Sequence, residues 1–405
     1  MNILIISQVF PYPPHSSGAK LKLYYLMKSL AERNKIYLVS FYEADSELEG
    51  IGEVGKYCEA TYPFRRSDRR DDSAFPLIRK IFGRFPAESH SYLDEAMIRK
   101  IGEVIREHKI DMVHCELIYM AQYAEYIPEK VPKIISINDV NWLLWKDMYE
   151  REKRPAEKIR NFVHYLRTRN FELKYYKKFD KCIVVSQRDR KELLPYMPDQ
   201  DIAVIPNGVD RDLFVPSENR QDPPGLVFTG VMSYRPNIDA MQYFCKDIFP
   251  IIKREAPGVK LYIVGMDPAP EVESMGSDDI VVTGFVKDIT EYATKASVYV
   301  APLRMGSGIK NKVLEAMAMG LPIVASRSGI DAIDGTAGED FLVADDPAGF
   351  AGAVVALLKD KGKRAELGKN ARRTIENKYG WQQIAHKYEE MYKAVGKGMM
   401  AGEGA

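Results

Sequence analysis

The chain has 405 residues, of which 46% are apolar, 28% charged and 11% aromatic, a composition typical of a globular protein with two or three domains. Its 58 basic and 57 acidic side chains give a formal net charge of +1, which argues against a nucleic-acid coat. No apolar run approaches 18 residues, the first residues do not resemble a secretory leader, and the four cysteines form no CxxC pair. We therefore expect a cytoplasmic protein with reduced thiols and no zinc site.

The first half of the chain alternates short apolar runs with helical periodicity. The opening residues predict a strand, a helix and a second strand, and three further apolar runs predict later strands. The predicted strands are 2–7, 35–41, 112–115, 133–137 and 181–185, and the first helix is 19–33. This order predicts a doubly wound α/β domain with right-handed crossovers.

The second half repeats the plan. Strands are predicted at 225–229, 259–264, 280–283, 298–301 and 321–325, and helices at 238–255, 289–296, 310–319 and 350–358. An Asn-Gly turn follows Pro206, so we place the domain junction just before it. The predicted domains are residues 1–200 and 201–376.

Ligands of open parallel sheets bind at the carboxyl ends of the strands, so the loops that follow strands deserve a search. After the first strand, Ser17 and Gly18 stand directly before a helix. Their amides can approach a polyol or a phosphate group. An ordinary turn with a serine helix cap is an equally good interpretation.

Polar residues also end two later strands of the first half. His114 and Glu116 lie in DMVHCE, and Asn138 and Asp139 follow KIISI. An apolar core has no use for such residues, which favours a functional role at the sheet edge. A lone His114 is, however, more often a hydrogen-bonded structural histidine than a catalytic one.

The most informative segment of the second half is PLRMGSGIKNKVLEAMAMG. A predicted strand runs into Gly306, Ser307 and Gly308, and a helix follows at once. Backbone amides of such a loop can face a ligand, and the helix dipole favours a diphosphate. Lys310 and Lys312 lie in the first turn, where cations are normally unfavourable, so their position indicates a nearby anion.

Glu315 follows on the same helix, flanked by apolar residues. A carboxylate in such surroundings needs a partner or water, and the two hydroxyls of a nucleotide ribose are a good candidate partner. The alternative is a solvent-facing glutamate of an amphipathic helix. No GxGxxG follows a first strand, no GxxxxGK[ST] occurs and no GxSxG opens a helix, which argues against dehydrogenases, nucleotide triphosphatases and serine hydrolases.

LEAMAMGLPIVAS resembles the signature of the family 4 glycosyltransferases, enzymes of the two-Rossmann GT-B fold. NILIISQVFPYPP, DMVHCE, VVSQRDRKELL, VIPNGVDRDLF, LVFTGVMSYRPNIDAMQYF and VTGFVKDITEYATKASVYVAPL extend the resemblance along most of the chain. The resemblance implies two doubly wound Rossmann-like domains that face a cleft. It also implies that a final helix, at 377–395, packs back on the first domain.

The same resemblance implies a retaining hexosyl transfer from a nucleotide-diphospho-sugar, bound by the second domain, to an acceptor on the first. The acceptor is a saccharide, a lipid-linked saccharide or a small molecule, as in the synthesis of cell-surface polysaccharide or glycoconjugates. No cofactor and no essential metal are implied, because positive side chains and helix N-termini stabilise the departing diphosphate.

The residues implied for these roles are as follows: Asn138, Asp139 and His114 as catalytic; Arg235, Gly284, Phe285, Val286, Gly306, Ser307, Gly308, Lys310, Lys312 and Glu315 at the donor; Ser17, Gly18 and Glu116 on the acceptor side.

The chain departs from the family pattern at three positions. Ser307 stands where the family has the first of two glutamates, Ala240 stands at a usual lysine, and Asn138 stands at a usual histidine. These departures leave open two alternatives: a protein that binds nucleotide-sugars without catalysis, and a GT-B nucleotide-sugar epimerase.

Residues 146–181 carry twelve Lys or Arg and six Asp or Glu, interleaved with aromatic residues. Solvated helix faces explain such a run, and so does contact with anionic lipid. A cytoplasmic protein, peripheral on the inner face of the membrane, is the corresponding hypothesis.

Overall fold

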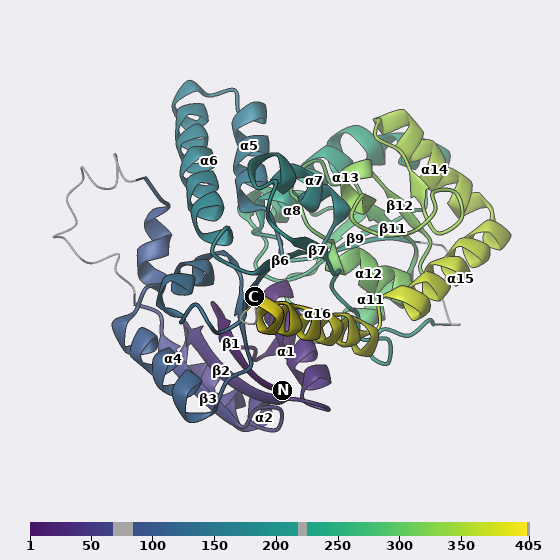
Figure 1. Cartoon of the computed structure of the whole chain (residues 1–405). Helices are drawn as coiled ribbons and strands as arrows, with labels where there is room; N and C mark the ends of the chain where they lie inside the picture. Colours follow the sequence, from purple (N-terminus) through teal and green to yellow (C-terminus); the bar gives the residue numbers. More distant parts are fainter. Residues whose placement is uncertain (68–83, 218–224, 403–405) are drawn as a thin grey trace. The chain divides into compact units, whose positions relative to one another are not determined.

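The computed structural model describes residues 1–67, 84–217 and 225–402, with side chains described up to residue 396. The chain folds into two compact units (Figure 1). Unit 1 comprises Met1–Asn207 and Trp381–Ala405, and unit 2 comprises Gly208–Gly380. The division falls between Asn207 and Gly208, inside the predicted turn, instead of after residue 200.

Unit 1 is built on a seven-stranded sheet with the order β3-β2-β1-β4-β5-β6-β7, in which all neighbouring strands are parallel. Its strands are β1 (Asn2–Ser7), β2 (Lys35–Tyr42), β3 (Ala60–Arg65), β4 (Met112–Glu116), β5 (Lys133–Ile137), β6 (Lys181–Val184) and β7 (Ile202–Val204). Its helices are α1 (Gly18–Leu30), α2 (Ile51–Val54), α4 (Glu95–Glu107), α5 (Asn141–Arg151), α6 (Pro155–Tyr176), α7 (Gln187–Leu193) and α16 (Trp381–Gly402).

Successive side chains of the central strands point to opposite faces of the sheet, so the core of unit 1 has two layers. Leu4 and Ile6 of β1 belong to the apolar cluster that includes residues of α4 and α6. Ile3 and Ile5 face the other way, into a cluster shared with α1 and α16. The last helix, α16, lies beside α1 and completes this second layer (Figure 1).

Unit 2 has a six-stranded parallel sheet with the order β10-β9-β8-β11-β12-β13, the strand order typical of a Rossmann domain. Its strands are β8 (Gly225–Thr229), β9 (Leu261–Val264), β10 (Ile280–Val282), β11 (Ala296–Ala301), β12 (Ile323–Ala325) and β13 (Leu342–Val343). Its helices are α8 (Arg235–Tyr243), α9 (Phe249–Glu255), α10 (Pro270–Glu273), α11 (Thr290–Lys295), α12 (Asn311–Ala318), α13 (Arg327–Ile330), α14 (Pro347–Lys359) and α15 (Lys361–Lys378). The predicted α/β class with two doubly wound sheets is confirmed.

The predicted helix 238–255 is not one regular helix. It consists of α8, a π-helical turn at Phe244–Ile248, and α9. Pro250 has no amide proton to donate to the carbonyl four residues earlier, so the hydrogen-bond ladder changes register before it.

Three of the four edge strands, β3, β7 and β13, were not predicted from the sequence, whereas the fourth, β10, was. β7 and β13 have three and two residues, too few to form an apolar run. β3 is half-buried and contains Pro63, which an edge strand tolerates because one of its sides needs no ladder hydrogen bonds. Among the described residues, no helix is both long and apolar enough to cross a bilayer.

Candidate active site

The loop after β11 passes through two glycines before α12 begins. Gly306 and Gly308 have φ angles of 95° and 71°, a conformation that side chains disfavour. Ser307 is buried between them. The Lys310 ammonium folds back and donates to the carbonyl oxygens of Ser307 at 2.5 Å and Gly308 at 3.3 Å. The loop thus brings four of the predicted donor residues together.

Lys312 lies in the first turn of α12 and is half-buried. Its Nζ donates to Asn237 Oδ1 and lies 4.3 Å from the centre of the Phe228 ring. Burial, reinforced by the neighbouring Lys310, lowers the pKa of Lys312 to about 7. An anion beside this ammonium would raise that pKa again.

Glu315 lies three residues further along α12 and is also half-buried. Burial raises the pKa of its carboxyl to about 7, against the opposing effect of Lys312. In the described part of the chain its carboxylate accepts no hydrogen bond. A ligand that supplies hydroxyl donors would therefore satisfy a group that the protein leaves incomplete.

Two glycines let the chain approach Lys312 closely. Gly230, after β8, has a φ of 152°, and a Cβ there would lie 2.8 Å from Asn237 Nδ2 and 3.0 Å from Lys312 Nζ. Gly265, after β9, has a φ of 151°, and its Cβ would lie 1.7 Å from the Gly230 carbonyl oxygen. The carboxyl end of β8 therefore meets Lys312, and the carboxyl end of β9 meets that of β8, without room for side chains at the two glycines.

Arg235 is exposed at the first residue of α8. The glycine loop lies against this end of α8, since a Cβ on Gly306 would be 3.8 Å from Pro236 Cγ. Arg304, which follows β11 in the same loop, was not predicted from the sequence. Its guanidinium forms a bidentate pair with Asp239 of α8, at 3.0 and 2.6 Å. An arginine directly after a strand end was the available signal.

Gly284, Phe285 and Val286 follow β10, the edge strand of the same sheet. Gly284 has a φ of 66°, and the Phe285 side chain is 72% exposed. They share the carboxyl edge of the sheet with the loop at Gly306, but no described contact joins the two segments.

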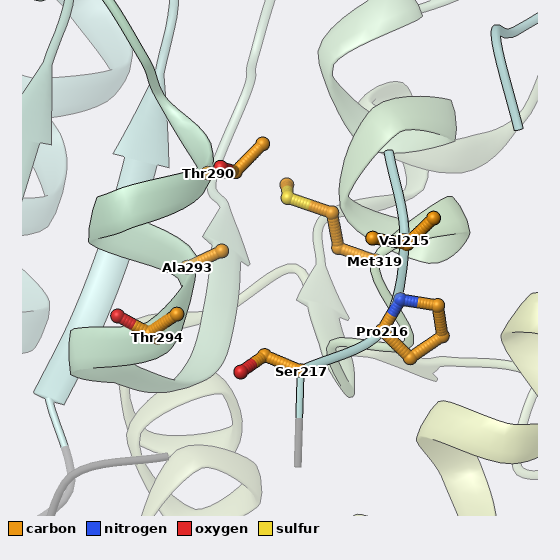
Figure 2. A pocket seen from close by; sticks show the side chains of 7 residues that line it. All are labelled: Val215, Pro216, Ser217, Thr290, Ala293, Thr294 and Met319. Atoms are coloured by element: carbon orange, nitrogen blue, oxygen red, sulfur yellow. The ribbon is translucent and has the colours of Figure 1, made fainter. Parts of the chain in front are cut away.

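A pocket of about 330 Å³ lies elsewhere in unit 2 (Figure 2). Figure 2 shows Met319 pointing between α11 and the segment that includes Pro216. The pocket is lined by Val215, Pro216, Ser217, Thr290, Ala293, Thr294 and Met319. None of these is charged and none is a predicted donor residue, so this pocket does not fit a diphosphate.

The predicted residues of unit 1 lie around a buried lysine that the sequence analysis missed. Lys22 of α1 donates to Glu116 Oε1 at 2.8 Å, to Ser136 Oγ at 2.6 Å and to Asn138 Oδ1 at 2.5 Å. Glu116 and Ser136 are register partners on β4 and β5, which explains why one ammonium reaches both. Lys22 stands four residues before Leu26, on the apolar stripe of α1, and a lysine on such a stripe was the available signal.

His114 continues this network toward α16. Its Nε2 lies 3.1 Å from Glu116 Oε2, and its Nδ1 lies 2.7 Å from the Tyr392 hydroxyl. The Tyr388 hydroxyl lies 3.1 Å from Ser136 Oγ, and its ring stacks on His114.

Burial sets the charges of this network. Burial disfavours charged Lys22, but Glu116 and Tyr388 outweigh it and the pKa of Lys22 is raised. Burial likewise opposes ionisation of Glu116, but Lys22 and His114 outweigh it and lower its pKa. Burial lowers the pKa of His114 more than Glu116 raises it. The network is therefore an ion pair of Lys22 and Glu116 beside a neutral imidazole.

The side chains of His114 and Glu116 are both 0% exposed and hydrogen-bonded to each other inside unit 1. The roles predicted for them remain predictions, which this burial does not favour. The structural interpretation of His114 agrees with its surroundings.

Ser17 is the helix cap of α1, because its side chain accepts from the Lys20 amide at 3.3 Å. Gly18 is exposed at the first residue of that helix.

Asn138 and Asp139 lie directly after β5 and are half-buried. Behind them, buried Glu172 of α6 accepts from the Asn141 amide at 3.0 Å. Burial raises the pKa of Glu172 to about 8. Of the three catalytic residues predicted from the sequence, these two are half-buried and His114 is fully buried.

Comparison with family models gives two matches that together span most of the chain. Residues 17–213 match the model described as Glycosyltransferase Family 4, and residues 223–360 match the model described as Glycosyl transferases group 1.

Individual proteins agree with these models. An uncharacterized 44.6 kDa protein in the cps region of Klebsiella pneumoniae is 21% identical over 400 residues, which cover 94% of this chain and 97% of the relative. A phosphatidyl-myo-inositol mannosyltransferase of Mycolicibacterium smegmatis is 28% identical over 239 residues, 55% of this chain and 59% of the relative. The crystal structure of Anabaena HepE in complex with UDP shares the fold, with a TM-score of 0.65 and 14% identity over 97% of this chain and 100% of that chain.

Proposed function

Because this chain belongs to the group 1 glycosyltransferases of family 4, we propose that it transfers a hexosyl group from a nucleotide-diphospho-sugar to a saccharide or lipid-linked acceptor with retention of configuration. In this reaction the acceptor oxygen bonds to the anomeric carbon and the bond from that carbon to the phosphate oxygen breaks. The nucleoside diphosphate leaves with the bonding electrons, and the acceptor hydroxyl proton passes to the leaving phosphate.

The observation that carries the donor site is the half-buried pair of Lys312 and Glu315. The pKa of each is about 7, because each is buried without a full complement of partners. A nucleoside diphosphate supplies what both lack: phosphate oxygens for the ammonium and ribose hydroxyls for the carboxylate. The UDP in the HepE structure makes a uridine nucleotide the first ligand to test.

Binding and turnover of a panel of nucleotide-sugars test this function directly. We expect thermal stabilisation by one nucleoside diphosphate, about 2.7 kcal/mol at 100 times its dissociation constant. We also expect release of that diphosphate when an acceptor is added. Binding without turnover would favour the non-catalytic alternative, and a changed free nucleotide-sugar would favour the epimerase.

The leaving diphosphate can be neutralised by Arg235, Lys310 and Lys312 together with the amides at the start of α12. We therefore propose that no essential metal takes part. Turnover should persist in EDTA, whereas complete loss that magnesium or manganese restores would contradict this proposal.

Retention of configuration rests on the family alone. Proton NMR of the first-formed product is the test, and an inverted anomeric carbon would contradict it. An acceptor in polysaccharide or glycolipid synthesis is supported by the names of two relatives. One is the Mycolicibacterium mannosyltransferase, and the other is a capsular polysaccharide biosynthesis glycosyltransferase of Staphylococcus aureus, 27% identical over 155 residues.

A cytoplasmic enzyme that docks on an anionic membrane is supported by the hairpin of α5 and α6, which lie side by side (Figure 1). Three large apolar residues of α6 recur on one helical face: Ile159 is 66% exposed, Phe162 39% and Leu166 36%. Cations flank this stripe, among them Lys158 and Arg160. An apolar stripe between cations matches the chemistry of an anionic bilayer surface.

Co-sedimentation with vesicles tests the docking. The protein should pellet with anionic vesicles at low salt and less at high salt, since each basic residue near the surface contributes about 1 kcal/mol, screened by salt. Leu166→Ser should weaken pelleting, and Leu213→Ser, which changes a leucine 43% exposed in unit 2, should not. Equal pelleting with neutral and anionic vesicles would contradict docking.

A further inference from the structure

We propose that Lys22 is a positioning residue that turns Asn138 into a fixed hydrogen-bond donor for an oxygen of the bound sugar or acceptor. The inference rests on the proposed function for the identity of the ligand. Its evidence is the arrangement around the Lys22 ammonium, which is complete within unit 1.

The Lys22 side chain is 1% exposed and has all of its donors in use. An ammonium has three N–H groups and no acceptor. The three hydrogen bonds go to Glu116, Ser136 and Asn138, at 2.8, 2.6 and 2.5 Å. No water is needed to satisfy this charge.

These bonds decide which way the Asn138 amide points. Because a lysine can only donate, the atom that faces Lys22 must be the amide oxygen and not the nitrogen. The side-chain NH₂ group of Asn138 is then left with two N–H donors, and no described contact of the chain uses them. Asn138 is half-buried at the carboxyl edge of the sheet, where ligands of parallel sheets bind.

The Lys22 side chain cannot readily rotate away from Asn138, because Glu116 and Ser136 are themselves held by further hydrogen-bond partners. Glu116 also accepts from His114, which contacts the Tyr392 hydroxyl. Ser136 contacts the Tyr388 hydroxyl. A rotation of Lys22 would leave a buried carboxylate without its cation, at a high cost in free energy.

This geometry limits the chemistry at position 138. An amide NH₂ can donate to a hydroxyl, ring or phosphate oxygen, but it cannot accept a proton. Asn138 is therefore inferred to orient a substrate oxygen. A group that can accept a proton is offered by the neighbouring carboxylate of Asp139. A fixed donor loses less conformational entropy on binding than a rotating one.

Asn138→Asp keeps the contact with Lys22 but removes the two N–H donors of the amide. The carboxylate keeps an oxygen toward Lys22, so the melting temperature should stay within about 2 °C of the parent. The two donors are lost, so kcat/KM should fall about ten- to a hundredfold. Asn170→Asp, at an exposed position of α6, makes the same chemical change away from the site and should alter neither.

Asn138→Leu removes the contact to Lys22 as well. It should lower the melting temperature by about 3–10 °C in the parent chain and by much less in a Lys22→Met/Glu116→Leu chain, where no ammonium is left to satisfy. This stability cycle needs no activity, so it can succeed even if the proposed function fails. Parental kcat/KM in Asn138→Asp, or equal destabilisation by Asn138→Leu in both chains, would overturn the inference.

Discussion

The buried charged side chains at the sheet edges of the two units differ in how many hydrogen-bond partners the protein gives them. In unit 1, the Lys22 ammonium has three protein partners, and the carboxylate of Glu116 has two. In unit 2, Lys312 bonds to one neutral amide, and the Glu315 carboxylate accepts no hydrogen bond from the described chain. The protein itself satisfies the charged groups at the edge of unit 1. The charged groups at the edge of unit 2 lack hydrogen-bond partners, which a ligand could supply.

The pKa values express the same contrast. Partners keep Lys22 and Glu116 charged despite their burial, whereas burial dominates at Lys312 and Glu315. Removing one member of a completed pair leaves an uncompensated buried charge, whereas a charge without enough partners can be stabilised by a bound ligand. Substitutions of these charged residues should therefore affect stability at Lys22 and Glu116, and affinity at Lys312 and Glu315.

The largest effect should follow Glu116→Leu, which leaves Lys22 as an uncompensated buried charge. We expect a loss of about 3–5 kcal/mol in the free energy of unfolding of unit 1, measured by chemical denaturation. The double variant Lys22→Met/Glu116→Leu should recover most of that loss, because it buries no charge. If the single and double variants are equally unstable, the loss of stability comes from lost packing and not from an uncompensated charge.

Glu315→Gln should act on binding instead. The amide keeps the shape of the side chain but weakens its acceptors for ribose hydroxyls, which contribute about 1.5–3 kcal/mol each when charge-assisted. We expect donor affinity or turnover to fall by about ten- to a thousandfold with little change in melting temperature. Calorimetry and initial rates are the measurements. Parental binding would mean that the donor site is elsewhere.

Protonation of Lys312 should be visible in the pH dependence of binding. Free Lys312 loses its proton above about pH 7, and the diphosphate favours the charged form, so binding above pH 7 must take up a proton. UDP affinity should fall by up to about tenfold per pH unit between about pH 7.5 and 9. Calorimetry in buffers of different ionisation enthalpy counts the protons. Lys312→Met should abolish the uptake, and a parent chain without uptake would contradict the assignment.

Ser307→Ala should have the smallest effect. One neutral hydroxyl is worth about 1 kcal/mol, or about fivefold in donor affinity. Measured beside Glu315→Gln, this loss shows how much Ser307 contributes to recognition of the donor sugar. A loss larger than that of Glu315→Gln would mean that Ser307 contributes more to donor binding than Glu315 does.

Apolar runs and glycine loops were enough to predict the central strands and the start of α12, because both are local properties of the sequence. The edge strands β7 and β13 are too short to carry such a signal, and the π-helical turn before Pro250 depends on a single missing donor.

Residue roles were harder, since they depend on what the fold places nearby. The sequence puts His114 and Glu116 at a strand end, as expected of site residues. It does not show that Lys22 and two tyrosines of α16 enclose them. Lys22 is remote from all of these positions in the sequence, and only the sheet register and the helix packing bring it to them.

That α16 belongs to unit 1 has a consequence for how the protein is made. Unit 2 is one uninterrupted stretch of chain, whereas unit 1 needs residues that the ribosome adds only after all of unit 2. At about 5–20 residues per second, roughly 10–35 seconds pass between synthesis of Asn207 and Trp381. During that interval Ile3, Ile5 and the face of α1 have no α16 to cover them, and His114 has no Tyr392. The nascent amino-terminal half is therefore a natural client for chaperones, and unit 2 can finish folding before the half that was translated first.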